Sequence, residues 1–370
     1  MKQNTIMKIK DLGQSIWLDF FDREIMDSGK LKMLIEEDGI SGVTSNPSIF
    51  EKAISSGPDY DEDISTLSQT RKSLDSIFFG LAVKDIKRAA DLFKPVYKKS
   101  NGEDGFVSLE VSPLLAHDTE GTIRQAEKLW KAVGRKNVMI KIPATDEGLP
   151  AIRKCISEGI NINITLLFGL PRYREVADAY ILGLEDRFNA NHSISQVSSV
   201  ASFFLSRIDV MIDPMLESKR MSALKGEVAI ASAKKAYQIY KDVFFSKRFR
   251  RLQALGAKRQ KVLWASTSTK DPSFSDVKYV EALIGNETIN TIPLETLGAF
   301  NDHGNAESLL ENDPAKASYV LDQLIKNEID INASTKKLED EGIEKFNKAY
   351  DKILKGIEKK LVHSLSNVNT

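Results

Sequence analysis

The sequence has very little cysteine and histidine, and several common nucleotide and hydrolase motifs are missing. A single cysteine, Cys155, among 370 residues excludes an internal disulfide and fits a reducing compartment. The four histidines are scattered, with no pair three or four positions apart, so we expect no zinc or other metal site. No Gly-x-Gly-x-x-Gly, Walker or Gly-x-Ser-x-Gly pattern occurs, which argues against nucleotide and serine-hydrolase chemistry.

The sequence also lacks an excess of either charge and any long apolar run. Lysine plus arginine equals aspartate plus glutamate at 52 each, so no overall field favours nucleic acid or an anionic membrane. The basic stretch at 246–261 has no groove-reading motif nearby and is interpreted as a helix face exposed to solvent. No run approaches membrane-spanning length, and the first residues lack the apolar core of a signal peptide. We therefore expect a soluble, cytoplasmic protein that binds neither nucleic acid nor membrane.

Short apolar runs, many of them β-branched, alternate with segments of helical periodicity. We predict strands at 15–20, 39–46, 106–111, 137–142, 162–168, 197–204, 261–266 and 289–293. Two of the helical segments, 121–134 and 147–159, end at glycines that suit helix C-caps. Strands separated by helices pair in parallel, and eight such units predict an α/β fold of the closed (β/α)₈ barrel type. Strand counting leaves an open doubly wound sheet as the alternative.

The run "NVMIKIPATDEG" at 137–148 places a lysine inside a predicted buried strand. Strand side chains alternate between two faces, so Lys141 shares a face with Met139 and opposes Ile140 and Ile142. The same alternation puts polar side chains on the inferred inward face of neighbouring strands, mostly near their C-terminal ends: Asp19, Asn46, Glu110, Lys141, Asn163 and Thr165. Barrel enzymes carry their active sites at that end.

Each of these residues also has an interpretation without a catalytic role. A charged residue at a strand end is more often a solvated rim residue. Asn46 precedes Pro47 and could simply close a strand and begin a helix, and Glu110 and Lys141 could form a structural ion pair. A functional role is favoured because burying six polar groups on one inward face costs free energy that a core without a function would avoid.

The chemistry of the inward set is that of a Schiff-base aldolase. Burial disfavours the charged form of a lysine, which makes neutral amine available to attack a carbonyl carbon. Asp19 and Glu110 supply acid and base groups. Asn46, Asn163 and Thr165 supply hydrogen bonds for substrate hydroxyls.

Seven segments, in order, carry a family resemblance. They are "WLDFFDR", "GVTSNPSIF", "VSLEVSP", "VMIKIPAT", "INITLLF", "VASFFLSRID" and "LWASTSTKDP". Together they resemble transaldolase in its longer bacterial form, from about residue 12 to residue 300, and the final helices also fit. The resemblance implies a (β/α)₈ TIM barrel with extra helices, working without cofactor or metal. It implies a single domain over 1–370, with 306–365 as C-terminal helices packed on the barrel.

The implied activity belongs to the pentose phosphate pathway. A dihydroxyacetone unit moves from sedoheptulose 7-phosphate or fructose 6-phosphate to glyceraldehyde 3-phosphate or erythrose 4-phosphate. By the resemblance, Lys141 forms the Schiff base, and Asp19 is the general acid/base for carbon–carbon cleavage. Glu110 and Thr165 hold a water that shuttles protons, and Asn46 and Asn163 bind the dihydroxyacetone hydroxyls.

The resemblance also assigns the phosphate end of the site, where the sequence departs from it. Ser202 and Phe204 would line the site, and Arg207 would bind the phosphate with help from Ser266. Shorter transaldolases carry an arginine two residues after the serine that matches Ser266, and this chain has Ser268 there. Lys270, close by, could supply the missing charge as a point donor.

Two alternative functions remain. Fructose 6-phosphate aldolase has a tyrosine and a glutamine where this chain has Phe204 and Glu110, so the sequence favours transfer. A non-catalytic barrel that binds sugar phosphates is disfavoured, because binding alone needs no amine nucleophile. The oligomeric state is left open, with a homodimer as one option.

Overall fold

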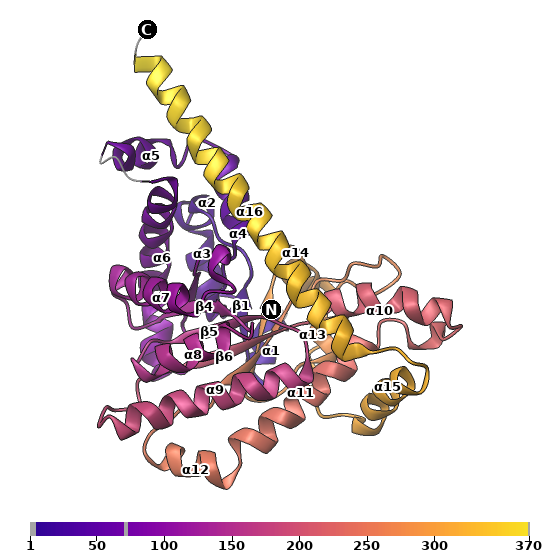
Figure 1. Cartoon of the computed structure of the whole chain (residues 1–370). Helices are drawn as coiled ribbons and strands as arrows, with labels where there is room; N and C mark the ends of the chain where they lie inside the picture. The colour runs from indigo at the N-terminus through magenta and orange to yellow at the C-terminus, as the bar shows by residue number, and fades with distance from the viewer. Residues whose placement is uncertain (1–4, 70–72, 369–370) are drawn as a thin grey trace.

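Eight parallel strands form a closed barrel in chain order (Figure 1). The structure is a computed structural model, which describes residues 5–69 and 73–368. The strands are β1 (Gln14–Leu18), β2 (Gly42–Val43), β3 (Val107–Glu110), β4 (Val138–Pro143), β5 (Ile162–Leu167), β6 (Ser199–Phe204), β7 (Lys261–Ala265) and β8 (Thr288–Ile292). The first strand pairs with the last, in register from Gln14 opposite Thr288 to Leu18 opposite Ile292. The predicted (β/α)₈ barrel is confirmed, and the open sheet is excluded.

Helices connect the strands and surround the barrel. Over the described residues they are α1 (Thr5–Asp11), α2 (Arg23–Asp27), α3 (Lys30–Glu36), α4 (Pro47–Ser55), α5 (Asp61–Ser68), α6 (Leu74–Lys99), α7 (Thr119–Val133), α8 (Gly148–Ser157), α9 (Leu170–Asn189), α10 (Ser206–Ser218), α11 (Val228–Phe244), α12 (Lys247–Ala254), α13 (Lys278–Ala282), α14 (Leu294–His303), α15 (Pro314–Lys326) and α16 (Ile331–Val368). Two short 3₁₀ helices lie at Pro113–Leu115 and Ser222–Leu224.

Local sequence explains where the helices begin and end, as α7 illustrates. Its N-cap, Asp118, accepts a hydrogen bond from the Gly121 backbone N–H. Its C-cap, Gly134, takes the left-handed conformation (φ 59°), which glycine adopts without a Cβ penalty. The helix after β4 ends in the same way, with Gly159 at φ 82° just beyond Ser157. Both predicted glycine stops are confirmed.

Two strands differ from their predicted form. The run at 39–46 contributes only Gly42–Val43 as a strand. Thr44 still donates its backbone N–H to the Leu18 carbonyl oxygen, and Asn46 becomes the N-cap of α4. In β5 the alternation stops near its end, where the register shifts between Ile164 and Leu167 and Leu166 has φ 55°. A Cβ placed on Gly342 of α16 would lie 2.8 Å from Leu166 Cδ2, so the Leu166 side chain lies against α16.

The C-terminal helix α16 runs across the molecule (yellow in Figure 1). It packs mainly on α4 and also contacts α5, α6, α10 and β5. Buried apolar residues along it, among them Ile343, Phe346 and Tyr350, form this contact. Since β5 and the helices after β2 and β6 all meet α16, the helix lies beside the C-terminal ends of the barrel strands.

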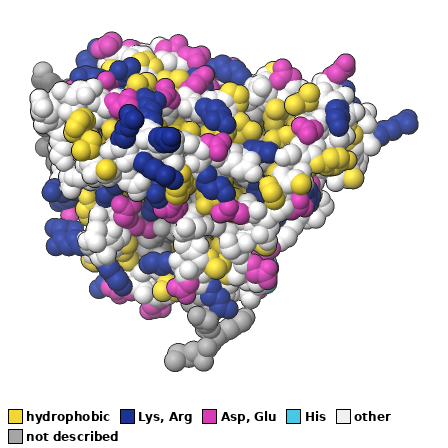
Figure 2. All heavy atoms as spheres, turned by 90° about the horizontal axis from the view of Figure 1, so that it is seen from below, with side chains coloured by type: hydrophobic (Ala, Val, Ile, Leu, Met, Phe, Trp, Pro, Cys, Tyr) yellow, Lys and Arg dark blue, Asp and Glu magenta, His cyan; other side chains and the backbone are white. Residues whose placement is uncertain are grey.

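The surface seen from below carries both charge signs interspersed (Figure 2). In the basic stretch, Phe249 and Leu252 of α12 are buried while Arg250 and Arg251 are exposed, which confirms the predicted solvated helix face. Arg248 of the same helix is paired with Asp178 and Glu185. Among the described residues, no helix is both long enough and apolar enough to cross a membrane.

Candidate active site

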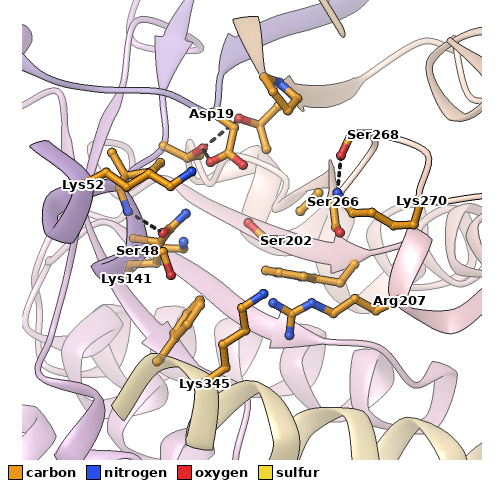
Figure 3. A pocket seen from close by; sticks show the side chains of 18 residues that line it. Asp19, Ser48, Lys52, Lys141, Ser202, Arg207, Ser266, Ser268, Lys270 and Lys345 are labelled. Carbon is orange, nitrogen blue, oxygen red and sulfur yellow. Dashed lines mark hydrogen bonds between the residues drawn. The ribbon is translucent and has the colours of Figure 1, made fainter. Parts of the chain in front are cut away.

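A cavity of about 320 Å³ opens at the C-terminal ends of the barrel strands (Figure 3). Eight of the eleven residues predicted from the sequence line it: Asp19, Asn46, Lys141, Ser202, Phe204, Arg207, Ser266 and Lys270. The other three, Glu110, Asn163 and Thr165, are buried and lie outside its lining. The fold thus brings together side chains from all parts of the barrel.

Lys141 lies on β4 with only 4% of the residue exposed. Its Nζ donates a hydrogen bond to the Ser45 carbonyl oxygen at 3.0 Å and lies 3.5 Å from Glu110 Oε2. The side chain reaches the cavity lining, so the amine is held between a buried carboxyl and open space. That position suits a nucleophile that must meet a bound substrate.

Asp19 follows the last residue of β1 and accepts a hydrogen bond from Thr44, which is itself hydrogen-bonded to Thr291. Thr44 Oγ1 donates to Asp19 Oδ1 at 2.9 Å, and Thr44 and Thr291 share a hydrogen bond of 2.8 Å. Burial raises the pKa of Asp19, and the positive charge of Lys141 and the Thr44 hydrogen bond offset part of that rise. Thr291 was missed in the sequence, although the alternation on the eighth strand is a signal that could have found it.

Glu110 is a second buried carboxyl of the site whose pKa is raised. Burial raises its pKa from 4.5 to about 7, against the opposing charge of Lys141. Its Oε2 and the Thr165 hydroxyl are both buried, and neither has a hydrogen-bond partner among the described residues. Buried polar atoms of this kind are normally satisfied by a bound water or ligand.

Asn163 and Asn46 make contacts that their predicted binding role did not anticipate. Asn163 Nδ2 donates to Ser108 Oγ at 2.9 Å, and its Oδ1 accepts from Ser202 Oγ at 2.7 Å. Asn163 therefore supports Ser202 from beneath the cavity. Asn46 Oδ1 accepts from the Ile49 backbone N–H at 3.1 Å, which confirms its helix-starting role, while the residue also lines the cavity.

The opposite side of the cavity is basic. Arg207 lies in the first turn of α10, with its guanidinium carbon 6.0 Å from the centre of the Phe204 ring. Lys270 Nζ donates to Ser268 Oγ at 2.7 Å (Figure 3). Lys52 of α4 and Lys345 of α16 also line the cavity. Neither was found in the sequence, where both look like ordinary exposed lysines of amphipathic helices.

Comparison of the sequence with known proteins identifies one family. The family model described as transaldolase/fructose-6-phosphate aldolase matches residues 16–357. The chain belongs to this family. Its curated relatives include a transaldolase of Trichodesmium erythraeum, 46% identical, with 98% of each chain covered. A transaldolase of Saccharopolyspora erythraea is 46% identical, covering 95% of this chain and 96% of that one. A transaldolase of Thiobacillus denitrificans is 41% identical, covering 95% and 99%.

Membership of the transaldolase/fructose-6-phosphate aldolase family confirms the resemblance read from the seven segments. The curated relatives carry the name transaldolase, and the match to the family model extends past the barrel into α16. Within the part of the chain that the structure describes, no group of three or more histidine, cysteine, aspartate or glutamate side chains is placed to hold a metal ion.

Proposed function

We propose that the chain is a transaldolase that transfers a dihydroxyacetone unit between sugar phosphates through a Schiff base on Lys141. The observation that carries the proposal is a buried primary amine at a cavity wall with two carboxyl groups of raised pKa, Asp19 and Glu110, beside it. Relatives that are 41–46% identical over 95–98% of the chain carry the name transaldolase, which supports the same reaction.

The first step joins the substrate to the enzyme. After Lys141 Nζ passes a proton to the Glu110 carboxylate 3.5 Å away, the amine attacks the carbonyl carbon C2 of a ketose phosphate, and loss of water from the carbinolamine leaves an iminium ion. The departing oxygen takes up a proton from Glu110, whose pKa of about 7 leaves both its forms populated at neutral pH. A water between Glu110 Oε2 and Thr165 Oγ1, two buried atoms that lack a hydrogen-bond partner among the described residues, would relay that proton.

The second step cleaves the bond between C3 and C4. Asp19 removes the proton of the C4 hydroxyl, the C4 oxygen becomes the carbonyl of the departing aldose phosphate, and the bonding electrons move into the iminium to give an enamine. Thr44 orients the carboxylate by donating a hydrogen bond to its Oδ1. The acceptor aldehyde then reacts with the enamine by the reverse sequence, and water releases the new ketose.

The two sides of the cavity bind different parts of the substrate. Asn46 and Ser202 bind hydroxyls of the dihydroxyacetone unit near Lys141, and Asn163 supports Ser202. The phosphate lies at the basic side, with Arg207, Ser266 and Lys270. The cavity volume of about 320 Å³ suits a single sugar phosphate, so donor and acceptor use it in turn.

The second candidate function within the family is a fructose 6-phosphate aldolase, which releases free dihydroxyacetone. Phe204 lines the cavity, packs on Phe168 with ring centres 5.2 Å apart, and offers no hydroxyl. A side chain without a proton donor gives water less help to hydrolyse the intermediate, which favours transfer to an aldose phosphate.

The domain organisation, location and oligomeric state of the protein are also proposed. We propose a single domain over 1–370, with 306–365 packed on the barrel, supported by the contacts of α16 with α4, α6 and β5. A cytoplasmic location and a homodimer likewise stay predictions.

One experiment tests the reaction directly. Borohydride with fructose 6-phosphate should add a reduced dihydroxyacetone unit to Lys141, identified by peptide mass. With erythrose 4-phosphate as acceptor, the enzyme should form sedoheptulose 7-phosphate from the same donor. The rate of this transfer should be far higher than the rate at which free dihydroxyacetone is released when no acceptor is present. Rapid release without acceptor would identify an aldolase, and absence of labelling despite sugar-phosphate binding would identify a non-catalytic barrel.

A further inference from the structure

Four basic side chains line one cavity: Lys52, Arg207, Lys270 and Lys345. Among the described residues, none of the four has a carboxylate within ion-pair distance, and their charged tips make one hydrogen bond, from Lys270 to Ser268. Lysines elsewhere on α16, such as Lys336 and Lys348, are paired with acidic residues of the same helix. A group of unpaired cations around a cavity is suited to an anionic ligand.

Lys345 is the member of this group that comes from outside the barrel. Its tip and that of Arg207 point toward each other in Figure 3, across the cavity from Lys141 and Asp19. The pKa of Lys345 is lowered, chiefly by the positive charge of Arg207, then by burial and by the charges of Lys270 and Lys52. Arg207 is thus the cation that Lys345 feels most strongly.

The shape of α16 permits this approach. A Cβ on Gly342, one turn before Lys345, would lie 3.6 Å from Arg207 Nη1 and 2.8 Å from Leu166 Cδ2. The glycine therefore lets the helix backbone pass close to Leu166 at the end of β5, and this packing brings α16 beside Arg207. Glu341 is the acidic residue whose charge acts on Arg207, and it is paired with Lys337 at 3.8 Å.

We infer that Lys345 binds the phosphate group of the substrate together with Arg207, so that the C-terminal helix completes the anion site of the barrel. The inference rests on the proposed function, which makes the ligand a sugar phosphate. Position 268 carries a neutral serine, and Lys270 already donates to it. Lys345 therefore supplies a second positive charge directly beside the Arg207 guanidinium, and a dianionic phosphate can bridge the two groups.

The test compares two lysines of α16: Lys345, which lines the cavity, and Lys348, which is paired with an acidic residue of the same helix. Lys345→Met should raise KM for fructose 6-phosphate about 10-fold, the usual loss for one charged hydrogen bond, with kcat little changed. It should weaken the binding of inorganic phosphate, measured by calorimetry, by a similar factor. Labelling of Lys141 by unphosphorylated dihydroxyacetone and borohydride should stay at the wild-type level. Lys345→Arg should keep most of the phosphate affinity.

Lys348→Met is the matched control, because Lys348 is exposed and paired with Glu344 at 2.6 Å. The inference is overturned if KM and phosphate affinity of Lys345→Met match those of Lys348→Met. It is also overturned if dihydroxyacetone labelling falls as much as phosphate affinity, since that result assigns Lys345 a structural role. If fructose 6-phosphate and borohydride do not label the wild-type protein, the proposed function is overturned. The inference about Lys345 is tested separately, because the binding of inorganic phosphate by calorimetry needs no turnover.

Discussion

Glu110 and Lys141 occupy paired positions on the neighbouring strands β3 and β4, and Glu110 Oε2 lies 3.5 Å from Lys141 Nζ. The ion pair expected from the sequence as an alternative to catalysis is therefore present. It is buried, and a buried charge pair is weak evidence for stability because both partners lose their hydration. The pair is better explained by a site that needs an amine beside a proton carrier.

Replacing Lys141 by methionine should abolish borohydride labelling by fructose 6-phosphate and leave the barrel folded. Methionine fills most of the lysine volume, and Glu110 can stay protonated, because the charge of Lys141 is what lowers the pKa of Glu110. Peptide mass after reduction checks the labelling, and circular dichroism checks the fold. Lys131→Met, at an exposed lysine of α7, serves as the control. Labelling that persists on another lysine would contradict the mechanism.

Replacing Asp19 by asparagine should preserve Schiff-base formation and slow carbon–carbon cleavage by about 100-fold or more. The amide keeps the shape of the carboxylate and can still accept the hydrogen bond from Thr44, but it cannot remove the C4 hydroxyl proton. Single-turnover release of glyceraldehyde 3-phosphate measures cleavage, and borohydride labelling measures Schiff-base formation in the same sample. Near-normal turnover would show that another group acts as the base.

Glu110→Gln should remove a pH dependence centred near pH 7 from the rate of Schiff-base formation. The wild-type carboxyl has a pKa of about 7, whereas an amide does not titrate in this range. Rates of labelling with dihydroxyacetone between pH 5.5 and 8.5, a range chosen to bracket about one and a half units on each side, check this. An unchanged profile in the variant would assign the titration to another residue.

The raised pKa of Glu110 also predicts how the free energy of unfolding of the wild type changes with pH relative to that of Glu110→Gln. The folded-state pKa of Glu110 is raised above the unfolded value, so its stabilising effect is complete below about pH 4.5 and is lost as the pH rises through about 7. The free energy of unfolding of the wild type should therefore fall relative to Glu110→Gln across that window, by at most about 1.4 kcal/mol per pH unit. Urea unfolding of both proteins at several pH values measures this change. A free energy of unfolding of the wild type that rises relative to that of Glu110→Gln as the pH increases would contradict the assignment.

Arg207→Ala and Lys270→Ala should each raise KM for fructose 6-phosphate by roughly 10-fold or more. Arg207 should matter more, because its planar guanidinium can bind phosphate with two parallel hydrogen bonds, whereas Lys270 also donates to Ser268. Activity with unphosphorylated fructose should change little and is the internal control. Equal losses on both substrates would mean that the two residues support the rim of the barrel.

The sequence determined the parts of the site that follow from local rules. Alternation along single strands placed Lys141, Glu110 and Asn163 on the inner face, and Asn46 before Pro47 indicated a helix start. These predictions succeed because side-chain direction in a strand and capping at a helix end depend on neighbouring residues only. The rule fails at Leu166, where a left-handed residue and a register shift interrupt the strand beneath α16.

Only the tertiary structure decided which distant side chains share the cavity. Thr44 and Thr291 meet over Asp19 because β8 closes the barrel against β1, and closure depends on all eight strands together. Lys345 reaches Arg207 because α16 packs across α4 and β5, with Gly342 allowing the close approach. In the sequence Lys345 is one lysine among many on an amphipathic helix. Only the fold places it beside Arg207, which lies far away along the chain.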